Sequence, residues 1–205
     1  MVLTRETLDR EIDALAAIEP AFGDVVAAHG RPAPRVRPTG HVTLLRTIMG
    51  QQVSVAAADA MWAKLVARFG EDPDLEALVA ADDVSLREAG LSRQKAGYAR
   101  SLSRLVLDGD VDFADLPDDN EDAIAELTKI KGIGRWTAEI YLLFSEGRPD
   151  AFPAGDLAVQ IELARILDRD ERPPEKLVRE WAMPWSPHRG AAAILAWHSY
   201  MAPPL

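Results

Sequence analysis

Apolar side chains recur every three or four residues along most of the chain, which is the spacing of amphipathic helices. Alanine and leucine dominate the apolar set and aromatic residues make up only 6% of the chain, so helices are favoured over strands. We therefore predict an all-α fold. The predicted helices lie within residues 5–29, where Pro20 divides or kinks the helix, and over residues 41–50, 55–69, 74–80, 84–89, 93–107, 121–130, 135–146, 157–167, 175–182 and 189–201.

Proline, glycine and capping residues separate these helices. Residues 31–40 read RPAPRVRPTG and predict an extended linker, because proline disfavours helices. Ser54 is a predicted N-cap of the helix that follows it. Core positions are expected at Leu157, Ile161, Leu163 and Trp197, and polar, solvent-facing positions at Arg93, Lys95, Arg100, Arg104, Glu162 and Arg165.

Residues 121–160 organise the rest of the chain. They predict a helix, a glycine turn reading KGIGR, a second helix, a short loop and then Asp156. The glycines allow a sharp turn, and the first N–H groups of the second helix lack internal acceptors, which favours phosphate binding beside Lys129, Lys131 and Arg135. An αα-hairpin that serves packing alone explains the turn equally well. Asp156 can likewise be read as a helix N-cap or as a catalytic carboxylate.

The charge distribution qualifies the phosphate interpretation. The net charge of −10 argues against a generic electrostatic DNA binder. However, residues 108–126 hold nine acidic residues and no lysine or arginine, and without them the chain is close to neutral. Basic residues gather instead at 87–104 and 129–135. A locally positive face with modest, salt-sensitive DNA affinity is therefore expected.

Several functional classes are disfavoured by what the sequence lacks. There is no cysteine, so disulfides, thiolate metal sites and an iron–sulfur cluster are excluded. The four histidines are scattered, and no phosphate-loop or dinucleotide fingerprint occurs, so we expect no nucleotide cofactor. No secretory signal pattern and no apolar run of 18 residues is present, so we expect no membrane association and a cytoplasmic location, bacterial in type and with the nucleoid.

Three segments, in this order and spacing, resemble the helix-hairpin-helix (HhH-GPD) DNA glycosylase superfamily. Within it the chain is most similar to the 3-methyladenine DNA glycosylase II type, from about residue 40 to the C-terminus. The segments are IMGQQVSVAAA at 48–58, GIGRWTA at 132–138 and FPAGDLAVQ at 152–160, and Pro-Trp at 184–185 fits the C-terminal end of the family pattern.

The resemblance implies one glycosylase unit over residues 1–205 with two helical lobes and a DNA cleft between them. Lobe A would span about 39–137 and carry the hairpin, and lobe B would combine about 1–38 with 138–205. Some relatives add an N-terminal β-domain, for which about 40 residues leave no room. Ile140 and Leu157 stand where some relatives have tyrosine, which implies a plainer base pocket.

The resemblance assigns catalysis to Asp156 and the walls of a base pocket to Trp136 and Trp185, with Trp181 as the competitor of Trp185. In bifunctional relatives a Schiff-base lysine stands at the position of Trp136. Tryptophan cannot form a Schiff base, so a monofunctional enzyme without lyase activity is implied.

The resemblance also implies which residues contact DNA. Gln52 would fill the stack after the target base has left, although two glutamines that only satisfy a turn remain the alternative. The hairpin backbone would grip DNA through Gly132, Ile133, Gly134, Arg135 and Thr137. No cofactor is required, but a structural Na⁺ or K⁺ would sit on the carbonyls of Thr128, Ile130 and Ile133.

The resemblance therefore implies a DNA glycosylase of base excision repair. It would flip out alkylated purines such as 3-methyladenine or 7-methylguanine from double-stranded DNA, hydrolyse the N-glycosidic bond and leave an abasic site, acting as a monomer. Two alternatives stay open. One is a glycosylase for another lesion, such as a deaminated or mismatched base. The other is a non-catalytic helix-hairpin-helix DNA-binding module in which Asp156 is only a cap.

Overall fold

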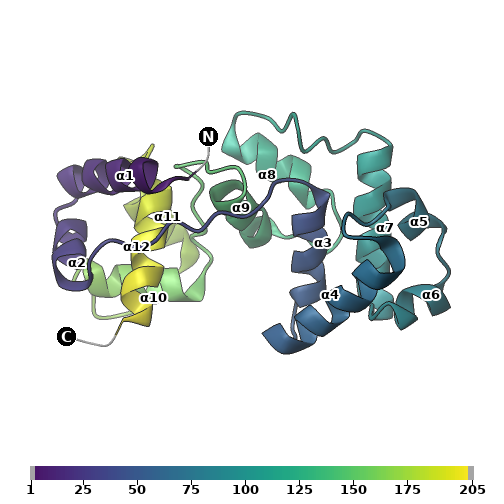
Figure 1. The fold of residues 1–205 in the computed structure, drawn as a ribbon. Helices are drawn as coiled ribbons and strands as arrows, with labels where there is room; N and C mark the ends of the chain where they lie inside the picture. Colours follow the sequence, from purple (N-terminus) through teal and green to yellow (C-terminus); the bar gives the residue numbers. More distant parts are fainter. Residues whose placement is uncertain (1–2, 203–205) are drawn as a thin grey trace. The chain divides into compact units, whose positions relative to one another are not determined.

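The computed structural model describes residues 3–202, and every regular element within that range is a helix (Figure 1). The prediction of an all-α fold is confirmed. None of these helices is long and apolar enough to span a membrane. The elements are α1 Arg5–Ile18, α2 Ala21–His29, α3 His41–Gly50, α4 Val55–Phe69, α5 Leu75–Ala80, α6 Asp83–Glu88, α7 Arg93–Leu107, α8 Asn120–Thr128, α9 Arg135–Phe144, α10 Leu157–Ile166, α11 Glu175–Trp181, the 3-10 helix η1 Met183–Trp185 and α12 Arg189–Met201.

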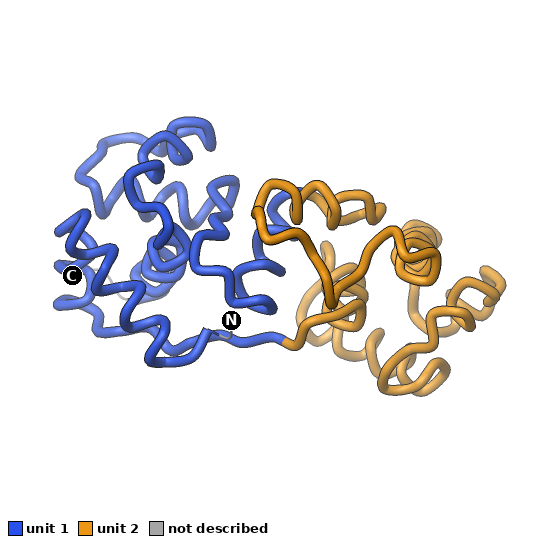
Figure 2. The backbone as a smooth tube through the Cα atoms, turned by 90° about the horizontal axis from the view of Figure 1, so that it is seen from above, with its two compact units in different colours: residues 1–37, 135–205 blue, residues 38–134 orange. Residues whose placement is uncertain are grey.

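The helices fall into two compact units, coloured separately in Figure 2. Unit 1 combines residues 1–37 with residues 135–205, and unit 2 is the continuous segment 38–134. The chain passes from unit 2 back into unit 1 immediately after the second glycine of the hairpin, between Gly134 and Arg135. The candidate catalytic residue and the candidate wedge therefore belong to different units.

Unit 1 is built around α12, which packs against α1, α2 and α10. Small residues on several sides of this helix allow its neighbours to approach closely. Gly190 shows how tight the approach is, because a Cβ at this position would lie 2.5 Å from the carbonyl oxygen of Pro149. The buried residues of α12 are Gly190, Ala191, Ala192, Ala193, Ile194, Leu195, Ala196 and Ser199.

Unit 2 is built around α7, which packs against α3, α5 and α6, while α3 also packs against α4. The hairpin follows α8 at the end of this unit. Five helices of this unit begin with a side-chain N-cap: Ser54 for α4, Asp74 for α5, Asp82 for α6, Ser92 for α7 and Asp119 for α8. The predicted cap at Ser54 is confirmed.

Helix α10 departs from the predicted pattern. Leu157 and Ile161, expected in the core, are 55% and 36% exposed, whereas Glu162, expected to face solvent, is buried. The prediction that Glu162 faces solvent is wrong. Arg165, one turn later, donates a 2.7 Å hydrogen bond to the Glu162 carboxylate, and this pairing permits the burial of Glu162. Leu157 and Ile161 thus point outward in the first turns after the candidate catalytic residue, whereas Leu163 is buried as predicted.

Two basic residues of α7 also depart from the expected solvated face. Lys95 donates a 2.7 Å hydrogen bond to the carbonyl of Met49, and burial lowers the pKa of its ammonium group. Arg100 bonds Asp83 and the carbonyl of Ala81, both at 2.7 Å. These two cations hold unit 2 together rather than forming a free basic surface.

Candidate active site

Asp156 begins α10 as its N-cap. Its backbone is extended, with φ −71° and ψ 126°, and its Oδ1 accepts hydrogen bonds from the amides of Ala158 and Val159 at 3.0 and 3.1 Å. The capping role is therefore confirmed. It does not exclude a second role, because the cap uses only one of the two carboxylate oxygens.

Two indole N–H groups converge on the same carboxylate. Trp136 of α9 donates to Oδ2 at 2.9 Å, and Trp197 of α12 donates to Oδ1 at 3.0 Å. Oδ1 thus accepts three hydrogen bonds, while Oδ2 accepts one from the protein. A carboxylate oxygen offers about two lone-pair directions, so Oδ2 retains capacity for a water or substrate atom.

The surface beside this carboxylate is apolar and accessible. Trp136 is 46% exposed although its indole N–H is fixed on Asp156. Leu157 follows Asp156 directly and Ile161 lies one turn later on α10, and both are exposed. An ionised carboxylate held next to an open indole and two aliphatic side chains suits a flat ligand with partial positive charge.

Hydrogen bonds hold the loop before Asp156 near both of its ends. Asp150 receives two hydrogen bonds from Arg189, at 2.7 and 2.6 Å, and one from Ser186 at 2.9 Å. Burial of Asp150 opposes its ionisation, but these hydrogen bonds outweigh that effect and lower its pKa. Arg189 therefore has a structural role at the start of α12. Nearer the site, the buried amide of Gln160 donates to the carbonyl of Ala154 at 2.9 Å.

A buried charge network lies at the start of α9. The Glu139 carboxylate is almost fully buried and accepts hydrogen bonds from Arg135 at 3.0 Å and Arg179 at 2.8 Å. Burial raises the pKa of Glu139, although both guanidinium groups oppose that shift. Arg179 also bonds Glu175, whose second oxygen would lie 3.0 Å from a Cβ at position 155. The network therefore reaches from Arg135, the predicted DNA contact, to the residue before Asp156.

The hairpin turn contains a glycine that no other residue replaces easily. Gly132 has φ +87°, and a Cβ there would lie 2.3 Å from the ring of Tyr98. Among the backbone hydrogen bonds described within residues 38–134, none is donated by the amide of Gly132 or Gly134, which is compatible with the predicted phosphate contact. Thr137, also predicted to face DNA, has a buried side chain, which leaves only its backbone for that role.

The three carbonyls predicted to hold a monovalent cation lie around this turn. Within residues 38–134, Ile130 accepts one hydrogen bond, from the amide of Ile133 at 3.0 Å, and the carbonyls of Thr128 and Ile133 accept none from this turn. Neutral carbonyl oxygens suit a hard monovalent ion, so the residues present fit such a group. The prediction of the ion itself stays a prediction.

The predicted wedge, Gln52, lies in the turn between α3 and α4. Its side chain is exposed, and its backbone adopts φ +57°, which is uncommon for a residue other than glycine. The preceding Gln51 donates from Nε2 to the carbonyl of Gly132 at 2.8 Å. The two glutamines thus differ, since Gln51 satisfies the hairpin and Gln52 points to solvent.

Residues 45–187 match the family model described as HhH-GPD superfamily base excision DNA repair protein. The chain belongs to the HhH-GPD superfamily. DNA-3-methyladenine glycosylase 1 of Schizosaccharomyces pombe is 33% identical over 159 residues, covering 75% of this chain and 69% of the relative. DNA-3-methyladenine glycosylase 2 of Escherichia coli is 28% identical over 165 residues, covering 76% and 56%.

Solved structures agree with this membership. A DNA-3-methyladenine glycosidase from Bacillus halodurans superposes with a TM-score of 0.86 at 29% identity, covering 93% of this chain and 89% of that one. The Schizosaccharomyces pombe 3-methyladenine DNA glycosylase, solved in complex with abasic DNA, gives 0.75 at 26% identity, covering 93% and 95%. The chain spans little more than half of several relatives, including 57% of a Bacillus subtilis protein that it matches with 30% identity.

The tryptophans of this HhH-GPD chain are distributed differently from the prediction. Trp185 is only 3% exposed and packs edge-on against Phe22 and Phe152, so its ring cannot receive a base without leaving the core. Trp181 lies under the guanidinium of Arg169 instead. The structure brings Trp136 and Asp156 together but leaves Trp185 apart from them.

Trp197 is the site residue that sequence reasoning missed in this HhH-GPD chain. It was expected in the core, but it is half-buried and bonds Asp156, while its ring lies 5.6 Å from that of Phe144. The available signal was a tryptophan in the second half of a helix that carries a glycine and four alanines. A large amphipathic side chain there suggests a ring packed on one edge and a polar N–H directed elsewhere.

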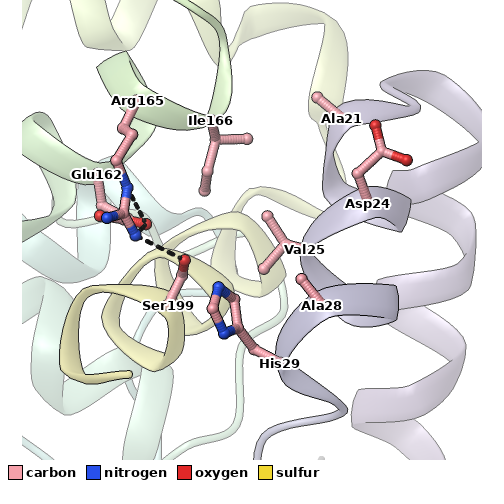
Figure 3. A pocket seen from close by; sticks show the side chains of 9 residues that line it. All are labelled: Ala21, Asp24, Val25, Ala28, His29, Glu162, Arg165, Ile166 and Ser199. Carbon is pink, nitrogen blue, oxygen red and sulfur yellow. Dashed lines mark hydrogen bonds and ion pairs between the residues drawn. The ribbon is translucent and has the colours of Figure 1, made fainter. Parts of the chain in front are cut away.

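A separate pocket of about 380 Å³ opens in unit 1 between α2, α10 and α12 (Figure 3). Val25 and Ile166 give it an apolar wall, and Glu162, Arg165 and Ser199 form a hydrogen-bonded cluster at one side. Arg165 is paired with Glu162, and the carboxylate of Asp24 also lines the pocket. It includes none of the residues predicted for catalysis or DNA binding.

Proposed function

We propose that this protein is a monofunctional DNA glycosylase that removes alkylated purines from double-stranded DNA, leaving an abasic site. The observation that carries the proposal is the Asp156 carboxylate, which is oriented by Trp136 and Trp197 and keeps one oxygen available. Membership of the HhH-GPD superfamily supports base excision repair as the process. The relatives named for 3-methyladenine support the alkylated purine as the lesion.

The proposed reaction uses a single carboxylate, which acts on the sugar. The bond between C1′ and the base nitrogen breaks, and its electron pair leaves with the base, so the sugar develops oxocarbenium character. A carboxylate facing C1′ stabilises that positive charge, and Oδ2 of Asp156 can also orient the attacking water. The water oxygen bonds to C1′, and its proton passes to Asp156 or to solvent.

A cationic purine suits the remaining residues. Bases alkylated at N3 or N7 carry positive charge and depart as neutral molecules, so the reaction needs little general-acid assistance. The exposed face of Trp136 attracts such a cation by about 0.5–2 kcal/mol, depending on desolvation. Leu157 and Ile161 add apolar contact without hydrogen-bond groups that would select one base edge. A broad range of alkylated purines follows from these contacts.

The absence of lyase chemistry follows from Trp136. Strand cleavage through a Schiff base requires an amine nitrogen whose lone pair attacks C1′. The nitrogen lone pair of indole belongs to its aromatic system, and here its N–H is already directed at Asp156. The product is therefore an abasic site in an unbroken strand.

The test is base release from duplex DNA whose purines have been methylated. Wild-type protein is expected to liberate 3-methyladenine or 7-methylguanine, detected by chromatography, with strand breaks that appear only after alkali. Strand breaks without alkali would contradict the monofunctional assignment. DNA binding with no release of either base would favour the non-catalytic DNA-binding module.

A further inference from the structure

One face of α7 contacts both the candidate wedge turn and the hairpin. Lys95 donates to the carbonyl of Met49 at 2.7 Å, just before the wedge turn. Tyr98 places its ring against Gly132, and the hydroxyl of Ser101 accepts from the amide of Lys131 at 3.2 Å. These three residues are spaced by three along the helix, so they lie on the same side.

Gln51 joins the same two segments directly. Its side-chain amide donates to the carbonyl of Gly132 at 2.8 Å, across 81 residues of sequence. Its own backbone amide closes the end of α3 by donating to Ile48 at 3.3 Å. The hydrogen bond is part-buried, which protects it from competition by water.

Gln52, the next residue, has the strained backbone. A non-glycine residue at φ +57° needs its neighbours to hold that conformation. Here Gln51 fixes the turn on one side, and Ser54 fixes the other by capping α4. Two exposed apolar side chains accompany Gln52: Val53 in the turn and Val55 at the start of α4. An exposed turn with a strained glutamine and neighbouring apolar side chains suits insertion between stacked bases.

We propose that Gln51, supported by Lys95, is a positioning residue that holds the Gln52 turn against the hairpin before DNA binds. The inference rests on the proposed function, because it assigns Gln52 to the gap left by the flipped base. The hairpin fixes one phosphate, and the Gln51 bond fixes the distance from that phosphate to the inserted side chain. A turn that is already ordered loses less conformational entropy on insertion, so base flipping is favoured.

The test replaces Gln51 with methionine, which keeps the length of the side chain and removes its donor. Binding to undamaged duplex is expected to stay within about twofold, because the hairpin amides are untouched. Two rates are expected to fall about tenfold. One is the rate of base flipping, monitored by the fluorescence of 2-aminopurine next to the lesion, and the other is the single-turnover rate of 3-methyladenine release. Gln94→Met is the matched control, since Gln94 is exposed and its side-chain amide bonds the hydroxyl of Tyr98 rather than the hairpin backbone, and it should leave both rates unchanged.

A structural readout separates positioning from general instability. Hydrogen exchange at the amides of residues 131–134 should accelerate in Gln51→Met, while thermal unfolding shifts little. Flipping and release within twofold of wild type would overturn the inference. So would a parallel loss of binding and release that follows the fraction of folded protein. Absence of base release by wild-type protein would instead refute the proposed function, and the fluorescence measurement would still report on Gln51.

Discussion

The indole N–H of Trp197 donates a 3.0 Å hydrogen bond to Oδ1 of Asp156, so the last helix of the chain orients the carboxylate that begins α10. With two backbone amides already on Oδ1, this bond completes the coordination of that oxygen. The rotation of the carboxylate is thereby fixed. Oδ2 is left as the oxygen that can act on a sugar or a water.

Asp156→Asn is expected to abolish base release while preserving the fold. Asparagine caps helices as well as aspartate does, so α10 should form normally. The neutral amide cannot stabilise an oxocarbenium ion, and we expect single-turnover release to fall at least about 100-fold. Asp170→Asn, which removes the same charge from an exposed loop, is the control. Full activity of Asp156→Asn would show that Asp156 is only a cap.

Trp197→Phe removes the N–H and keeps most of the ring. We expect stability to fall by about 0.5–1.5 kcal/mol in urea unfolding, the contribution of one hydrogen bond. Release should fall about tenfold, because Oδ1 loses a donor and the carboxylate can rotate. Trp181→Phe changes the same side chain away from the site and should leave the release rate unchanged. A normal release rate in Trp197→Phe would exclude an orienting role.

The two hairpin glycines should respond differently to alanine. Gly132→Ala places a Cβ within 2.3 Å of Tyr98 at φ +87°, so we expect a loss of more than about 2 kcal/mol in unfolding free energy. Gly134 has no heavy atom within 4 Å of an added Cβ and no positive φ, so Gly134→Ala should change stability by less than about 0.5 kcal/mol. Thermal or urea unfolding of the pair measures this contrast, and equal losses would contradict it.

Asp150→Asn should destabilise the protein in a pH-dependent way. Because hydrogen bonds from Arg189 and Ser186 lower the pKa of Asp150 in the folded state, its contribution is fully present above its ordinary pKa of 3.8. It is lost as pH falls through the lower, folded-state pKa. At pH 7 we expect a loss of about 1–3 kcal/mol, since the variant removes the ion pair between Asp150 and Arg189.

Urea unfolding of wild type and Asp150→Asn at several pH values measures this difference. The gap between the two proteins should be constant from pH 7 to about pH 5 and shrink below pH 4. A gap that widens on acidification would show that Asp150 is not stabilised as a carboxylate. Asp168→Asn, at an aspartate outside this loop, offers a comparison without the Arg189 pair.

Local sequence signals were enough to locate the helices. The predicted ranges 41–50, 55–69, 93–107 and 189–201 coincide with α3, α4, α7 and α12. The chain itself marks some of these boundaries, since Ser54 and Gly70 bound α4 and Ser92 caps α7. The helix that starts at Arg135 was predicted two residues too long. Gly147, with φ +69°, lies three residues beyond the last helical residue, so the glycine stop signal falls slightly past the observed end.

The partners of Asp156 could not be predicted in the same way. Trp197 is 41 residues away, and its contact depends on how α10 and α12 pack, which no local pattern encodes. The exposure of Leu157 and Ile161 reverses the usual rule that apolar residues turn inward. Such reversals occur where a surface is shaped for a ligand rather than for the core. Trp185 shows the opposite departure. It was expected to line an open base pocket, but its aromatic neighbours enclose it.

The left-handed backbone at Gln52 has an evolutionary consequence. Glycine or asparagine would relieve the strain at φ +57°, a conformation that costs most other residues about 1–2 kcal/mol. Either replacement would also shorten the side chain that reaches furthest from the turn. A directed-evolution campaign that selects only for heat resistance should therefore recover Gln52→Gly or Gln52→Asn and impair repair. Selection for survival of alkylating agents should restore glutamine at this position.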